Sequence, residues 1–132
     1  MPSSNRPLSP HVMHYRLPLL AWLSMTHRIT GVALSVGTLL VMYWLLALAA
    51  GPDAYERAQA TMTSGFGQFV LFGFTWALFY HLCNGIRHLV WDVGYNLDIE
   101  GAESSGKLVL IASILLTIFS WIFGHALSGG AL

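Results

Sequence analysis

The sequence predicts an all-α membrane protein with three transmembrane helices. Of its 132 residues, 55% are hydrophobic and only 9% are charged, whereas soluble domains carry about 25% charged residues. Three stretches, residues 29–50, 58–86 and 108–132, contain no Asp, Glu, Lys or Arg. Each can supply the roughly 20 apolar residues that a helix needs to cross a bilayer.

We expect one membrane-anchor domain over residues 1–132, because a chain of this length allows at most one domain. Its parts are a cytoplasmic N-terminal segment (1–20) and helices at about 21–50, 62–92 and 105–130. The sequence GPDAYERAQA (51–60) is expected to form a polar turn with a short interfacial helix. Within NLDIEGAESSGK (96–107), Ser104 or Ser105 can cap the third helix.

Basic residues predict which way the chain crosses the membrane. Five of the six precede the first span or lie between the second and third: Arg6, Arg16, Arg28, Arg87 and Lys107. The positive-inside rule then places the N-terminus in the cytoplasm, or in the matrix of a mitochondrion. Aromatic residues fit two interfacial belts, with Trp22, Trp91 and Tyr95 at that boundary and Tyr43, Trp44, Tyr55 and Trp121 at the other.

Some function classes are disfavoured by the same composition. The net charge is zero with histidines neutral, which gives no indication of nucleic-acid binding. Cys83 is the single cysteine, so an internal disulfide and a cysteine metal cage are excluded. The polar, proline-rich first 15 residues do not resemble a signal peptide, and we expect a bacterial protein.

His81 is the deepest histidine of the second span, in FYHLCNGIRHLVWD (79–92). An ionisable residue within a membrane is a functional hypothesis by default, although a neutral histidine can simply bond to a neighbouring helix. Residues four apart share a helix face, which places His81 in a stripe of small residues, Gly73, Ala77 and Gly85. Such a stripe favours close helix packing, and it also allows a flat macrocycle to approach.

A haem is the macrocycle that these residues suggest, because neutral imidazole is a common axial ligand of its iron. Its propionates would then point to the cytoplasmic rim, toward Arg28, Arg87 and His88. None of the other histidines is predicted to share the depth of His81, namely His11, His14, His27, His88 and His125. A six-coordinate haem would therefore take its second ligand from another subunit.

A second constellation lies at the start of the first span. Ser24, His27 and Arg28 have helical spacing i, i+3 and i+4, and Gly31 and Ser35 extend the same face. A quinone suits these groups, because its carbonyl oxygens need hydrogen-bond donors and its reduction needs protons. The alternative is ordinary anchoring, with the Arg28 side chain extended to the interface.

Both stretches carry a resemblance to a known family. The run RPLSPHVMHYRLPLLAWLSMTHRITGVALS (6–35) closely resembles the N-terminal signature of the cytochrome b subunit family of succinate dehydrogenase. The run HLCNGIRHLVWDVG (81–94) resembles its second signature, H-x-x-x-G-I-R-H-x-x-x-D. The resemblance covers essentially the whole chain, although spans one and three match mainly in hydrophobicity beyond the motifs.

The resemblance implies specific roles for these residues. His81 matches an axial ligand of haem b, whose other ligand comes from a second, smaller anchor subunit. Ser24 and Arg28 match positions that line the ubiquinone site, and Arg28 also borders the haem pocket. The remaining haem-pocket positions are His27, Gly85 and His88. The role of Asp92 stays open, with an ion pair to Arg87 or Arg28 as one interpretation.

The implied function is that of a membrane anchor of succinate dehydrogenase, respiratory complex II, in a bacterial inner membrane. A flavoprotein subunit with FAD oxidises succinate, and an iron–sulfur subunit passes the electrons to ubiquinone. This chain has no G-x-G-x-x-G motif and no cysteine cluster, so those centres belong to partners. Alternatives are the anchor of a quinol:fumarate reductase and a haemless structural anchor. A small transporter is disfavoured, because no span contains Asp or Glu.

Overall fold

The structure is a computed structural model that describes residue 5 and residues 16–129. These residues form four helices and no strand: α1 (Leu19–Ala50), α2 (Pro52–Thr63), α3 (Gly65–Asp92) and α4 (Ile99–Leu127). The helices α1, α3 and α4 are each long and apolar enough to cross a membrane. The prediction of an all-α protein with three transmembrane helices is confirmed. Arg6, His11 and His14 lie outside the described residues.

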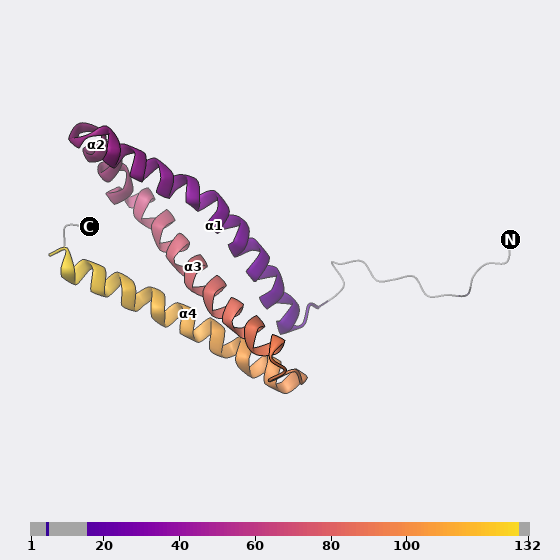
Figure 1. Cartoon of the computed structure of the whole chain (residues 1–132). Coiled ribbons are helices and arrows are strands. Elements are labelled where there is room, and N and C mark those ends of the chain that lie inside the picture. Colours follow the sequence, from indigo (N-terminus) through magenta and orange to yellow (C-terminus); the bar gives the residue numbers. More distant parts are fainter. Residues whose placement is uncertain (1–4, 6–15, 130–132) are drawn as a thin grey trace.

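The helix α3 lies between α1 and α4 and packs against both (Figure 1). The start of α1 and the connection from α3 to α4 lie at one end of the bundle, which we call the N-terminal end. The helix α2 lies at the opposite end, the α2 end, where α4 diverges from α1. Because α3 runs antiparallel to α1, the residues late in α3 lie beside those early in α1.

Local sequence signals explain where the helices end. Gly51 has φ 113°, a conformation that favours glycine, and it separates α1 from α2. The Ser64 hydroxyl accepts a hydrogen bond from Gly67 N at 3.1 Å at the start of α3. The Asp98 carboxylate accepts one from Gly101 N at 2.9 Å at the start of α4. Both are standard N-caps.

The start of α4 corrects one prediction. Neither Ser104 nor Ser105 caps this helix, which begins at Ile99, before the expected start at about residue 105. The charged residues Glu100 and Glu103 precede the expected start, yet a helix can extend beyond the apolar layer. The Asp98 cap and Glu100 in the first turn both favour the helix N-terminus electrostatically.

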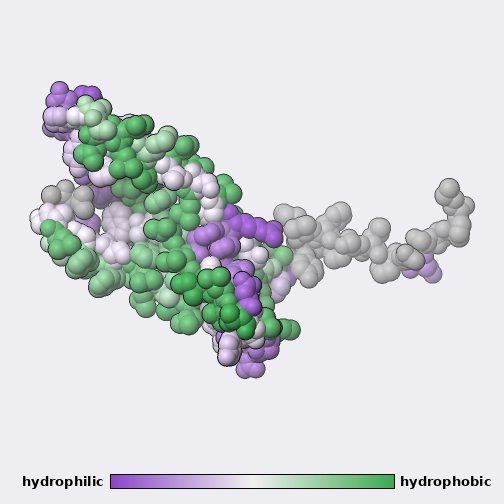
Figure 2. All heavy atoms as spheres, viewed as in Figure 1, coloured by the Kyte–Doolittle hydropathy of each residue, from purple (hydrophilic) through white to green (hydrophobic). Residues whose placement is uncertain are grey.

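The interior of the bundle is made of small and polar residues. The buried positions of α3 and α4 recur every three or four residues. They are Ala77, Tyr80, Asn84 and Arg87 on α3, and Ala102, Gly106, Val109, Ser113 and Thr117 on α4. Large apolar side chains instead cover much of the outside (Figure 2). This distribution is typical of membrane bundles, where small residues let helices approach and polar groups bond across them.

Hydrogen bonds also join the helices. The Tyr80 hydroxyl on α3 donates to the Leu23 carbonyl on α1 at 2.7 Å. The Trp121 indole on α4 donates to Thr75 Oγ1 on α3 at 3.2 Å. Because lipid offers no alternative partner, these bonds help to fix the relative positions of α1, α3 and α4.

Candidate functional site

Three histidine side chains gather between α1 and α3 at the N-terminal end. The rings of His27 and His81 are stacked, with centroids 3.9 Å apart and an interplanar angle of 9°. The His88 ring lies 5.2 Å from that of His27. We call these three residues the histidine cluster. The cluster joins both sequence motifs, which are about fifty residues apart along the chain, in one site.

The histidine cluster corrects the prediction that no other histidine shares the depth of His81. His27 does share it, because α1 begins at Leu19 and has already risen about 12 Å when it reaches His27. In the sequence, the charge of Arg28 marks the start of the first uncharged stretch, which placed His27 at the membrane boundary. Arg28 is exposed, and a long arginine can reach the interface from inside a helix.

The stacking of His27 on His81 excludes one arrangement of a haem. Two axial ligands approach the iron from opposite faces of the macrocycle. The two rings instead face each other at 3.9 Å, which leaves no space for a macrocycle between them. His27 is therefore a neighbour of His81 in this structure and is not placed as the opposite ligand.

Helix α1 holds the His81 ring in a fixed orientation. His81 Nδ1 lies 3.2 Å from the His27 carbonyl oxygen and 3.2 Å from Thr30 Oγ1. A Cβ at Gly31 would lie 3.1 Å from His81 Cε1, so a glycine is needed for this approach. Sequence reasoning missed Thr30, although its position three residues after His27 places it on the same face.

The residues around His81 fit a haem. A carbonyl oxygen only accepts hydrogen bonds, so the His27 carbonyl indicates that Nδ1 carries the hydrogen and Nε2 the lone pair. Within residues 16–129, Nε2 makes no hydrogen bond. One turn further along α3, a Cβ at Gly85 would meet no atom within 4 Å. A ring nitrogen that has a lone pair and no hydrogen bond is what an axial ligand requires.

Two polar atoms next to the cluster are buried without a partner in the described part of the chain: His27 Nδ1 and Asn84 Nδ2. Buried polar atoms normally have a hydrogen-bond partner. Both belong to residues at the N-terminal end, where His27 stacks on His81.

Arg87 is placed differently from the sequence expectation. Its side chain is only 6% exposed and donates to Ser105 Oγ at 2.9 Å, Ala102 O at 2.8 Å and Asn84 Oδ1 at 3.1 Å. The bonds to Ser105 and Ala102 join α3 to α4. Within the described residues Arg87 therefore does not pair with Asp92, and its expected contact with haem propionates stays a prediction.

The other predicted site residues lie at the surface of the same end. Ser24, Arg28, His88 and Asp92 are exposed, and His27 is half-buried. His88 Nδ1 lies 2.8 Å from the Asn84 carbonyl oxygen, so its ring is oriented by its own helix. Ser24 and Arg28 are thus accessible on α1, next to the half-buried His27 of the cluster.

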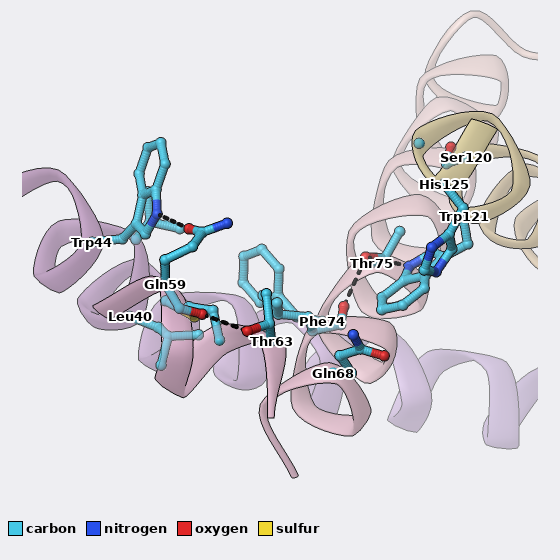
Figure 3. Close-up of a pocket in the computed structure, with 14 residues that line it drawn as sticks. Leu40, Trp44, Gln59, Thr63, Gln68, Phe74, Thr75, Ser120, Trp121 and His125 are labelled. Atoms are coloured by element: carbon cyan, nitrogen blue, oxygen red, sulfur yellow. Dashed lines mark hydrogen bonds between the residues drawn. The ribbon is translucent and has the colours of Figure 1, made fainter. Parts of the chain in front are cut away.

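A separate cavity of about 450 Å³ lies at the α2 end, with residues from all four helices in its wall (Figure 3). Trp44 donates to Gln59 Oε1 at 3.2 Å on one side, and Trp121 and His125 lie on the other. None of the predicted haem or quinone residues lines this cavity. The histidine cluster therefore remains the candidate site.

Comparison with known proteins identifies relatives over nearly the whole chain. The family model described as "Succinate dehydrogenase/Fumarate reductase transmembrane subunit" matches residues 2–120. The succinate dehydrogenase cytochrome b556 subunit of Paracoccus denitrificans is 45% identical over 89% of this chain and 91% of its own length. The cytochrome b556 subunit of Rickettsia felis is 38% identical over 90% and 93%. The mitochondrial cytochrome b560 subunit of Sus scrofa is 40% identical over 87% and 69%.

Proposed function

The chain belongs to the succinate dehydrogenase/fumarate reductase transmembrane subunit family, and we propose that it is the cytochrome b anchor of a succinate:quinone oxidoreductase. The names of its relatives, cytochrome b556 and cytochrome b560 subunits of succinate dehydrogenase, support this role. The observation that carries the proposal is the histidine cluster, in which His81 Nδ1 is held by α1 and Nε2 makes no hydrogen bond within the described residues.

His81 is the axial ligand of haem b that this chain supplies. A bound haem b supplies one-electron redox chemistry. The chain contributes the orientation of the ligand, since the His27 carbonyl and the Thr30 hydroxyl hold Nδ1 and Gly31 lets α1 pack closely. A second ligand would come from a partner anchor subunit, since the His27 ring is stacked on the His81 ring and leaves no room for a haem between them.

Residues at the N-terminal end would hold the haem propionates. Arg28 and His88 are exposed there, and His27 Nδ1 has no hydrogen-bond partner within residues 16–129. A carboxylate accepts hydrogen bonds from such groups and is stabilised by a nearby arginine. Gly85 leaves room for the edge of the ring.

Ser24 and Arg28 form this chain's part of the ubiquinone site. Their hydroxyl and guanidinium groups are exposed one turn apart on α1 and can donate hydrogen bonds to a quinone carbonyl. Quinone reduction to quinol takes two electrons and two protons. The electrons arrive from the iron–sulfur subunit. His27, which precedes Arg28 on α1, offers a nearby proton carrier.

This subunit crosses a bacterial inner membrane three times, with its N-terminus on the cytoplasmic side. The Paracoccus and Rickettsia relatives are bacterial proteins, and basic residues concentrate at the N-terminal end. That end also carries the quinone residues, so it is where the iron–sulfur subunit docks. The flavoprotein subunit, which holds FAD, attaches through the iron–sulfur subunit and makes no use of this chain's residues.

The family name covers fumarate reductase anchors too, and these would run the reaction in reverse. The relatives named here are dehydrogenase subunits, which favours succinate oxidation. Direct comparison of succinate:quinone and quinol:fumarate activities in the purified complex distinguishes the two. A faster quinol:fumarate reaction would contradict the proposed direction.

The quinone site is tested by Arg28→Ala and Ser24→Ala in the assembled complex. Loss of a hydrogen bond from the charged Arg28 costs about 1.5–3 kcal/mol, so quinone reduction should fall about tenfold or more in Arg28→Ala. Loss of the neutral Ser24 hydrogen bond costs about 0.5–1.5 kcal/mol, so the decrease in Ser24→Ala should be smaller, about two- to tenfold. Succinate oxidation with an artificial electron acceptor should persist, because the flavin is in another subunit. Arg57→Ala is the matched control, since Arg57 is an exposed arginine of α2. Normal quinone reduction in Arg28→Ala and Ser24→Ala would refute the assignment.

A further inference from the structure

We propose that Thr30 is a positioning residue whose hydroxyl oxygen is a second acceptor for the His81 Nδ1 hydrogen and fixes the orientation of the imidazole. The inference rests on the proposed function of His81 as a haem ligand. Thr30 is only 3% exposed and lies on α1, whereas His81 lies on α3. Its hydroxyl therefore reaches across from α1 to His81 Nδ1, whereas Nε2 is the proposed ligand atom.

The direction of each hydrogen bond can be worked out from the donors present. The Thr30 hydroxyl donates its one hydrogen to the His27 carbonyl at 2.9 Å. Its oxygen lies 3.2 Å from His81 Nδ1 and is left with lone pairs only. The His27 carbonyl, also 3.2 Å from Nδ1, is an acceptor as well. Both neighbours of Nδ1 therefore accept, and Nδ1 must be the donor.

This arrangement has two consequences for the ligand. The hydrogen on Nδ1 leaves the lone pair on Nε2, where an iron is bound. Two acceptors on Nδ1–H also draw the hydrogen away from the ring, which makes Nε2 a more basic ligand. A more basic ligand stabilises the oxidised iron over the reduced iron. Thr30 thus lowers the reduction potential of the haem that His81 binds.

The substitution Thr30→Val tests this inference, because it replaces the hydroxyl by a methyl group of similar size. Thr30→Ser keeps the hydroxyl and serves as the conservative variant. Thr26→Val is the matched control, since Thr26 lies one turn earlier on α1 and bonds to the Trp22 carbonyl. The complex is purified with its partner subunits, and the haem is titrated to obtain its midpoint potential and absorption spectrum.

We expect Thr30→Val to raise the potential, while Thr30→Ser and Thr26→Val stay at the wild-type value. The ratio of reduced to oxidised haem at a fixed potential should rise about threefold, which is about 30 mV for one electron. Loss of haem from an intact Thr30→Val complex, with haem retained in Thr30→Ser, would also support the inference.

Three results would overturn it. The first is a wild-type potential in Thr30→Val, and the second is an equal shift in Thr30→Val and Thr30→Ser, which would assign the effect to packing. The third is loss of haem from both Thr30 variants. In each case the wild-type complex still shows its haem, so the proposed function survives. A wild-type complex without haem would instead overturn the haem site itself.

Discussion

Gly31→Ala is predicted to disturb the His81 ligand while leaving the stability of the bundle nearly unchanged. The added Cβ would lie 3.1 Å from His81 Cε1, a few tenths of an ångström closer than ordinary contact. The His81 ring must move away from α1. Its Nδ1 already lies 3.2 Å from both acceptors, at the long end of the hydrogen-bond range, so these distances would grow to about 3.5 Å.

The substitution has two opposing effects on the stability of the bundle, which nearly cancel. The orientation of the His81 ring has no such compensation. Weakening one or two hydrogen bonds costs about 0.5–1.5 kcal/mol each. Alanine in place of glycine within a helix returns about 0.8–1 kcal/mol. The displaced His81 ring, however, loses the hydrogen bonds of Nδ1 to the His27 carbonyl and the Thr30 hydroxyl. Loss of such hydrogen bonds behind a metal ligand typically reduces metal affinity or activity about 10–100-fold.

The assay compares haem content, haem absorption and thermal unfolding of the assembled complex. Gly31→Ala should bind haem at least about tenfold more weakly, with a melting temperature close to that of the wild type. Gly124→Ala on α4 is the control, because its Cβ would meet no atom within 4 Å. Unchanged haem binding and spectrum in Gly31→Ala would refute the proposed placement of His81 against α1.

Two further predictions concern the scaffold. Arg87→Met removes two hydrogen bonds between α3 and α4. At about 0.6–1.7 kcal/mol each, their loss should lower the thermal stability of the complex in detergent. An unchanged melting temperature would contradict the role of Arg87 in joining the two helices. Asp98→Ala removes the α4 cap at a cost of about 1 kcal/mol and should speed amide hydrogen exchange in the first turn of α4. Exchange at the wild-type rate there would show that the cap contributes nothing.

The three spans could be predicted from sequence because the membrane imposes a one-dimensional rule. A run of about 20 residues without charge is read directly from the sequence. The helix limits are less predictable, since the start of α4 depends on Asp98 capping Gly101 N outside the apolar layer. No apolar pattern marks that position, although Asp98 and Glu100 fit the acidic start of a helix.

The sequence marked individual candidate residues, but it did not predict how their side chains are arranged relative to one another. His81 stood out as an ionisable residue in an apolar span, and the motifs marked His27 and His88. The stacking of His27 on His81 depends on how α1 and α3 pack, which no spacing along one helix gives. Arg87 illustrates the same limit, because its acceptors lie on α4, across the bundle.

The measurement that tests the central claim most directly is a reduced-minus-oxidised absorption spectrum of the purified complex. The wild-type complex should show a b-type haem, and His81→Ala should lose that signal while its subunits stay associated. His125→Ala is the control, because His125 lies in the cavity at the α2 end; it should keep the signal. An intact His81→Ala complex with an unchanged haem spectrum would contradict the assignment of His81.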